Sequence, residues 1–130
     1  MPIPKRMYDL YCGAYSREAK AIALAESQAD PLAISPEGLG AGIMQQSAAW
    51  QKDYAPLMGV VGSRLYEWAI AGGPWHPAFQ LACYATFVWK HKTLDRLARL
   101  RLFHYGHEQD ADPDGYAERV MQFFVTLEGW

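Results

Sequence analysis

Residues 19–45 read AKAIALAESQADPLAISPEGLGAGIMQ, a short helical pattern followed by a loop rich in glycine and proline. Ala19, Ile22 and Ala23 recur at the spacing of one helix stripe, and Glu26 takes the next position on that stripe. Because burial penalises a charged carboxylate, we expect the pKa of Glu26 to be raised toward the range of a proton donor at neutral pH. The alternative is a helix-terminal glutamate whose head group reaches solvent, as most charged side chains do.

The first half of the chain predicts short helices around one loop. A short helix or an irregular lead-in is expected at 7–14, and Ser16 is expected to cap the helix that runs to about Glu26. Prolines and glycines make 30–42 a loop in which the backbone can approach a ligand closely. Ser47 is then expected to cap a short helix at 48–54.

The second half predicts four more helices, which start near Pro56, Pro77, Thr93 and Tyr116. No segment alternates convincingly as a β-strand does, so we expect an all-α, compact, lysozyme-like orthogonal helical domain that spans residues 1–130. The side chains expected to face inward are Leu57, Val60, Val61, Leu65 and Trp68, then Ala78, Leu81, Ala82, Ala85 and Val88, then Leu94, Leu97 and Leu100, and finally Tyr116, Val120, Phe123 and Phe124.

Composition excludes several classes of protein. The net charge is −2, with 51% hydrophobic and 20% charged residues, so neither a nucleic-acid-binding patch nor a disordered acidic tail is indicated. No apolar stretch is long enough to span a bilayer. Cys12 and Cys83 are too few for a disulfide scaffold or a metal cluster, and we expect two buried free thiols, with a single disulfide as the alternative.

The opening stretch resembles the catalytic motif of the soluble lytic transglycosylases, which have the fold of goose-type lysozymes and cleave peptidoglycan glycan strands. The family motif runs Glu-Ser, Asn-Pro, Ala, Ser, Gly-Ala and Gly-Leu-Met-Gln. This chain has one extra residue between Ser35 and Gly42, and 46–49 read Gln-Ser-Ala-Ala where the family continues with Met-Pro and Thr-Ala. The similar positions are Glu26-Ser27, Asp30-Pro31, Ala33, Ser35-Pro36, Gly38 and Gly42-Ile43-Met44-Gln45.

Two later segments are similar to further motifs of that family. Residues 103–106, Phe-His-Tyr-Gly, resemble Tyr-Asn-x-Gly, so His104 stands where the family usually has Asn, and Tyr116 resembles a later tyrosine. Tyr84 stands where the family has glycine. The resemblance extends over about 19–121. The positions similar to the family's Asp-Pro, Asn, Ile and Tyr-Leu are His76-Pro77, Gln80, Leu81 and Phe87-Val88.

The resemblance implies cleavage of the β-1,4 MurNAc–GlcNAc bond of peptidoglycan. Glu26 first protonates the leaving oxygen, and as a carboxylate it then takes a proton from the C6 hydroxyl of the muramic acid, which closes a 1,6-anhydro ring. Most glycosidases use a second carboxylate. None is obviously placed beside Glu26, because Asp30 lies beyond the expected helix end and Asp53 belongs to another segment. This favours a lytic transglycosylase over a hydrolytic lysozyme.

The resemblance also implies a set of substrate-binding residues. Ser35 would bond Glu26 or the substrate's acetamido group, Met44 and Gln45 would line the subsites, and Tyr116 would point its hydroxyl at the carboxylate. The full expected set is Ser35, Met44, Gln45, Gln80, His104, Tyr105 and Tyr116. Alternatively Ser35 is a turn residue, Met44 is core and the aromatics only pack.

Two alternatives to a transglycosylase stay open. The first is a hydrolytic, goose-type muramidase on the same scaffold. The second is a non-catalytic domain that binds peptidoglycan or serves a structural role, which the altered segment 46–49 and His104 favour. Trp75, in a Gly-Gly-Pro-Trp-His turn, is a candidate for a sugar-stacking wall.

Metal and cofactor patterns are weak. His104 and His107 can share a helix face, but no His-Glu-x-x-His pattern and no paired cysteines accompany them. Asp110, Asp112 and Asp114 copy the first half of an EF-hand loop, yet its twelfth position is Met121. We expect a solvated acidic turn that caps the last helix, with no metal and no cofactor.

The partner expected from the resemblance is the glycan strand of peptidoglycan, with no nucleic acid, no membrane insertion and a monomeric chain. Residues 1–13 lack the apolar run of a secretory signal. We therefore expect synthesis in the cytoplasm and delivery to the cell wall by a holin, a secretion machine or a virion.

Overall fold

The computed structural model describes residues 3–35, 40–58, 69–107 and 111–130 of the chain. Within these ranges the chain is helical, and its only β features are the isolated bridges Ile34–Ala41 and Ala41–Gln46. The predicted all-α class is confirmed. The helices are α1 (Lys5–Cys12), α2 (Ser16–Ser27), α3 (Ala48–Tyr54), α6 (Pro77–Lys90), α7 (Arg96–Tyr105) and α8 (Tyr116–Thr126), with short 3₁₀ helices at Gly13–Tyr15 and Ala55–Leu57.

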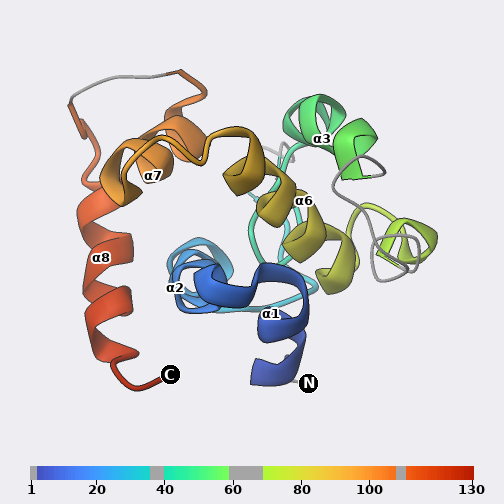
Figure 1. The fold of residues 1–130 in the computed structure, drawn as a ribbon, viewed down its shortest axis with the longest axis horizontal. Coiled ribbons are helices and arrows are strands. Elements are labelled where there is room, and N and C mark those ends of the chain that lie inside the picture. Colours follow the sequence, from blue (N-terminus) through green and yellow to red (C-terminus); the bar gives the residue numbers. More distant parts are fainter. Residues whose placement is uncertain (1–2, 36–39, 59–68, 108–110) are drawn as a thin grey trace.

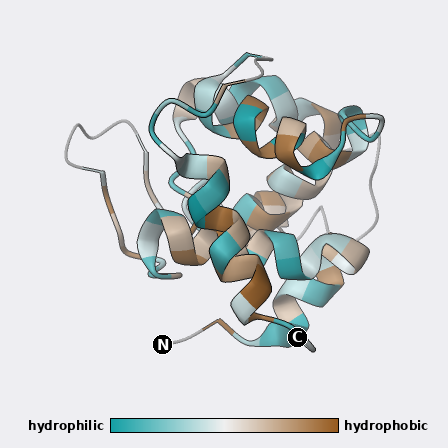
Figure 2. Ribbon diagram, turned by 90° about the vertical axis from the view of Figure 1, so that its left-hand side faces the viewer, coloured by the Kyte–Doolittle hydropathy of each residue, from teal (hydrophilic) through white to brown (hydrophobic). Residues whose placement is uncertain are grey.

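Helix α2, which carries Glu26, lies in the middle of the arrangement (Figure 1). It packs against α1 and α8, while α1 also packs against α6 and α7 packs against α8. Hydrophobic and hydrophilic residues are mixed around the helices, as expected for amphipathic helices with one buried face (Figure 2). The largest fully buried apolar side chains come from α1, α2, α6, α7, α8 and the loop after α2, and they include Tyr8, Ile22, Ile43, Met44, Leu81, Tyr84, Phe87, Leu100 and Tyr116.

The caps of α2 and α3 test two predictions. Ser47 caps α3 as predicted, because its hydroxyl oxygen accepts from the backbone N–H of Trp50 at 3.1 Å. The prediction for Ser16 is wrong. Ser16 is the first residue of α2 and has helical backbone angles, because the preceding 3₁₀ turn runs directly into the helix and its N–H already bonds Gly13.

Helix α6 begins at Pro77 as predicted, and Leu81 and Ala82 are fully buried. Helix α7 begins at Arg96 rather than near Thr93, because the Asp95 carboxylate accepts from the N–H of Ala98 at 2.8 Å and caps it there.

Most inward side chains of α7 and α8 are as expected. Leu100 and Val120 are fully buried, and Phe123 and Phe124 pack against the core. Leu97 is 45% exposed, so its inward assignment is wrong. Of the helix expected from Pro56 to about 71, Val60, Val61, Leu65 and Trp68 lie outside the described residues.

A buried ion cluster holds α2 against α6 and α7. Glu18, 1% exposed, accepts from Arg99 Nη2 at 2.7 Å and from Arg96 Nε at 3.0 Å, both at Oε1. Its other oxygen accepts the hydroxyl of Tyr84. Because Glu26 lies two helical turns farther along α2, this cluster fixes the helix that positions it.

Cys12 and Cys83 are buried and free, as expected. None of the helices in the described ranges has the length and apolarity needed to cross a membrane.

Candidate active site

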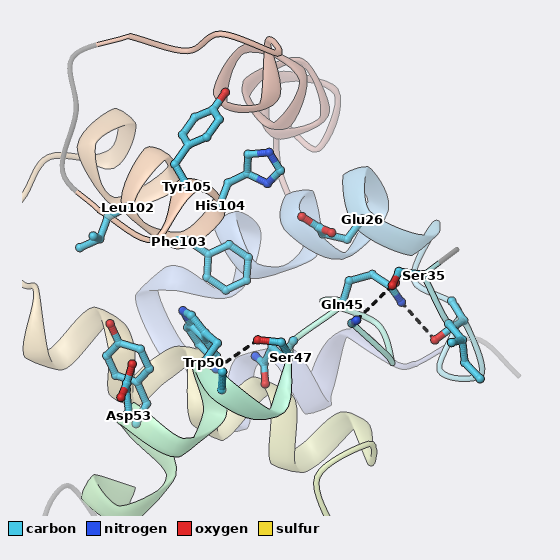
Figure 3. Close-up of a pocket in the computed structure, with 17 residues that line it drawn as sticks. Glu26, Ser35, Gln45, Ser47, Trp50, Asp53, Leu102, Phe103, His104 and Tyr105 are labelled. Atoms are coloured by element: carbon cyan, nitrogen blue, oxygen red, sulfur yellow. Dashed lines mark hydrogen bonds between the residues drawn. The ribbon is translucent and has the colours of Figure 1, made fainter. Parts of the chain in front are cut away.

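A groove of about 780 Å³ opens between the end of α2, the loop that follows it, and helices α3 and α7 (Figure 3). Helix α2 contributes Glu26, and the loop contributes Ser35 and Gln45. The facing walls come from α3 and α7, with Trp50 and Phe103 in edge-to-face contact at 5.0 Å between ring centres. The remaining lining residues are Ala33, Ile34, Gly40, Gln46, Ser47, Ala49, Asp53, Tyr54, Leu102, His104, Tyr105 and Gly106.

The Glu26 carboxyl lies at the groove from the last turn of α2 and is half-buried. Burial raises its pKa, as the helix pattern predicts. The Tyr116 hydroxyl and the charges of His104 and Arg119 oppose this shift, and the Asp114 carboxylate reinforces it. The net effect is a carboxyl that holds its proton to higher pH than a solvated glutamate does.

Tyr116, the first residue of α8, faces Glu26 from the protein interior. Its side chain is fully buried, and burial followed by the charge of Glu26 raises its pKa well above the ordinary value. The hydroxyl has no partner that meets full hydrogen-bond geometry among the described residues. The two groups are close enough to interact, as expected. Tyr116 does not line the groove, so its expected direct contact with substrate is wrong.

His104 and Tyr105 lie at the end of α7 and bind the turn that starts α8. The His104 ring stacks on the Tyr116 ring with 3.9 Å between centres and 9° between planes. Its Nε2 lies 2.7 Å from Asp114 Oδ2. The Tyr105 hydroxyl reaches Asp114 Oδ1 at 2.6 Å and Asp112 Oδ1 at 2.8 Å. His104 and Tyr105 both line the groove, as the expected site requires.

The loop between α2 and α3 is held by its own side chains. Ser27 Oγ donates to the carbonyl of Ile43 at 2.7 Å, which ties the end of α2 to the loop. Ser35 Oγ accepts from the N–H of Gly40 at 3.1 Å, so Ser35 binds Gly40 as well as lining the groove. Gln45 Nε2 donates to the carbonyls of Ala33 and Gly42. A bond from Ser35 to Glu26 stays a prediction.

Met44 and Gln80 do not line the groove, so the substrate contacts expected of them are wrong. Both side chains are fully buried. Gln80 accepts from the N–H of Met44 at 2.9 Å and donates to the carbonyl of Ala41 at 2.6 Å, so it holds the loop from below. The Met44 side chain packs in the core beneath this part of the loop. Both side chains therefore stabilise the loop that forms one wall of the groove, and neither is available to contact a substrate.

Two loop glycines allow close packing between protein segments, not the close approach to a ligand that the glycine content predicts. A Cβ on Gly42, where φ is +80°, would lie 2.4 Å from Gln80 Nε2. A Cβ on Gly40 would lie 2.5 Å from the carbonyl oxygen of Gln45. Glycine at 42 therefore lets the loop lie against Gln80, and glycine at 40 lets it lie against the backbone of Gln45.

Sequence reasoning missed the α3 wall. Asp53 lines the same groove as Glu26, although the two residues belong to separate segments of the sequence. In Figure 3 it lies toward the far end from Glu26, with Trp50 and Phe103 between them. Trp75 is 67% exposed and does not line the groove, so the aromatic wall is Trp50. Trp50, Asp53 and Tyr54 share i, i+3 and i+4 spacing, the signal that could have grouped them.

The acidic turn before α8 caps that helix, as expected. Asp112 accepts from the N–H groups of Ala117 and Glu118, and Asp114 accepts from that of Tyr116. Asp110 lies outside the described residues. Over the parts of the chain that are described, no group of three histidine, cysteine or acidic side chains could hold a metal ion.

No family model, curated protein or solved structure significantly matches this chain. Its function must therefore be inferred from the groove itself and from the residues that resemble the transglycosylase motifs.

Proposed function

We propose that this groove binds the glycan strand of bacterial peptidoglycan and cleaves its β-1,4 MurNAc–GlcNAc bond as a lytic transglycosylase. One observation carries the proposal: a half-buried glutamate with a raised pKa lies at a groove of about 780 Å³. That volume is in the range of small-molecule sites, about 300–1,000 Å³. Aromatic faces such as that of Trp50 suit contact with the apolar faces of sugar rings.

Protonated Glu26 can deliver its proton to the glycosidic oxygen as the C1–O bond breaks. The C6 hydroxyl of the same muramic acid residue then attacks C1, closes the 1,6-anhydro ring and passes its proton to a base, which is the Glu26 carboxylate when that residue acts as acid and then base. No water molecule is consumed. Tyr116 stabilises the Glu26 carboxylate that forms after proton delivery, because its hydroxyl interaction lowers the pKa of Glu26.

A hydrolytic muramidase is the second candidate, favoured by the presence of Asp53 in the same groove. A two-carboxylate mechanism needs the acids about 5–9.5 Å apart across the scissile bond. A single-carboxylate route needs no second acid beside Glu26, and in Figure 3 Trp50 and Phe103 lie between Glu26 and Asp53. Mass spectrometry of the released muropeptides separates the two, since a transglycosylase leaves 1,6-anhydro ends and a hydrolase leaves reducing ends.

The proposal is tested by the loss of turbidity of purified sacculi. Wild-type protein should solubilise them, and Glu26→Gln should be slower by about 10²- to 10⁴-fold, the usual contribution of a general acid. Glu128→Gln, an exposed glutamate outside the groove, is the matched control and should keep wild-type activity. Equal rates for wild type and Glu26→Gln, or binding to sacculi without release of fragments, would contradict the enzyme and support a binding domain.

A further inference from the structure

His104 and Asp114 form an oriented histidine–carboxylate pair at the edge of the groove. His104 Nε2 lies 2.7 Å from Asp114 Oδ2. The other oxygen of Asp114 is held by the Tyr105 hydroxyl at 2.6 Å and by the N–H of Tyr116 at 3.0 Å. The Tyr105 hydroxyl, and after it His104, lowers the pKa of Asp114 to about 2, so the carboxylate is ionised at neutral pH. A fixed, charged carboxylate thus sets the orientation of the imidazole.

The pair also sets which ring nitrogen can accept a proton. In neutral histidine one nitrogen donates and the other accepts, and an ionised carboxylate can only accept. In the neutral ring that bonds Asp114, Nε2 therefore carries the hydrogen and Nδ1 carries the lone pair. Nδ1 has no hydrogen-bond partner among the residues that the structure describes.

The imidazole of His104 and the carboxyl of Glu26 belong to the same groove. Both side chains line the groove and are directed toward one end of it in Figure 3. The ring of His104 lies flat on the ring of Tyr116, whose hydroxyl interacts with Glu26. This stacking fixes the plane of the imidazole relative to the carboxyl, so the groove contains a proton donor and an oriented proton acceptor.

We propose that His104, oriented by Asp114, is the base of the reaction, so that Glu26 acts only as the acid; this rests on the proposed function. His104 Nδ1 takes the proton of the C6 hydroxyl, and the freed oxygen electron pair forms the C1–O6 bond. The C1–O4 bond breaks, and O4 takes the proton of Glu26. The imidazolium then returns its proton to the Glu26 carboxylate, so no water and no net proton are consumed. Glu26 thus acts as the general acid and His104 as the general base.

If His104 has only a structural role, its replacement should have a different result. The same contacts fasten the end of α7 to the start of α8, and their loss would change stability and the position of Tyr116. Added imidazole cannot rebuild that link, but neutral imidazole in the vacated space can accept a proton. Rescue by imidazole therefore separates a base from a structural link.

The test measures initial rates on purified sacculi for wild type, His104→Ala, Asp114→Asn and the control His107→Ala, an exposed histidine outside the groove. His104→Ala should be slower by about 10²- to 10⁴-fold, and millimolar imidazole should restore about tenfold or more. The restored rate should follow the concentration of neutral imidazole and not that of imidazolium. Asp114→Asn should also be slower, because an amide does not fix the Nε2–H tautomer.

Each outcome decides the proposal. A His104→Ala rate within about threefold of wild type, or no restoration by imidazole, overturns it while Glu26→Gln still shows whether the proposed function holds. If Glu26→Gln is as active as wild type, the proposed function fails as well. If His104→Ala does not fold, as judged by its thermal transition, the rate of Asp114→Asn decides, and a wild-type rate overturns the proposal.

Discussion

Arg99 Nη2 lies 2.7 Å from Glu18 Oε1 inside the core, and both side chains are almost fully buried, at 6% and 1% exposed. Each would be an isolated buried charge without the other. Because Glu18 belongs to α2 and Arg99 to α7, this ion pair joins the helix that carries the candidate acid to the helix that forms the opposite wall.

Glu18→Gln should therefore lower the free energy of unfolding by about 3–5 kcal/mol, the usual cost of removing one partner of a buried pair. Urea unfolding measures this change in the free energy of unfolding. Asp9→Asn is the control, because the Lys5–Asp9 pair has the same kind of contact at 2.7 Å but is exposed, and its loss should change stability far less than the loss of Glu18 does. Equal losses for the two variants would contradict the importance of the buried cluster.

Gly42→Ala should destabilise the protein more than Gly106→Ala. The two glycines have nearly equal φ, +80° and +81°, so the backbone strain of an added Cβ is matched at about 1–2 kcal/mol. Only at Gly42 does the new Cβ meet the buried Gln80 amide, while nothing lies within 4 Å at Gly106. Thermal unfolding of both variants measures the difference, and an equal shift would mean that Gln80 moves aside freely.

Asp114 should make the stability of the protein fall in acid. Its pKa is lowered from 3.8 to about 2 in the folded state, so its contribution is fully present above pH 3.8 and is lost as the pH falls to about 2. Asp114→Asn should flatten the plot of melting temperature against pH in this window. An unchanged slope would show that the Tyr105 and His104 bonds to the carboxylate do not persist in solution.

Glu26 should make the stability of the protein fall as the pH rises, the opposite of the effect of Asp114. Its folded pKa is raised, so its contribution is fully present below the unfolded value of 4.5 and is lost as the pH rises through the folded value. Glu26→Gln should therefore be more stable than wild type at pH 7, with the gain shrinking below about pH 4, as at many functional sites. A less stable variant at pH 7 would count against burial of the charge.

Local patterns predicted the elements of this fold and part of its candidate site. Ser47 as a cap, Pro77 as a helix start and Glu26 on the buried stripe of α2 depend only on near neighbours in sequence. The expected inward position of Leu97 was wrong because charged Arg99 takes the inside of α7 by pairing with Glu18.

Contacts between residues far apart in the sequence could not be predicted from it. Glu18 meets Tyr84 and Arg99 across separations of 66 and 81 residues, and nothing near Glu18 signals those partners. Gln80 was assigned to substrate for the same reason, since only the folded chain shows that the loop turn at Met44 uses its amide.

The most direct test of the central claim is the pKa of the Glu26 carboxyl itself, followed by NMR on protein labelled with ¹³C at the glutamate side chains and assigned with Glu26→Gln. The carboxyl should titrate above 4.5, and Tyr116→Phe should raise the value further, because the phenol interaction lowers it. A carboxyl that titrates at or below 4.5, and that does not respond to Tyr116→Phe, would be that of a solvated glutamate and would contradict its role as the acid of this groove.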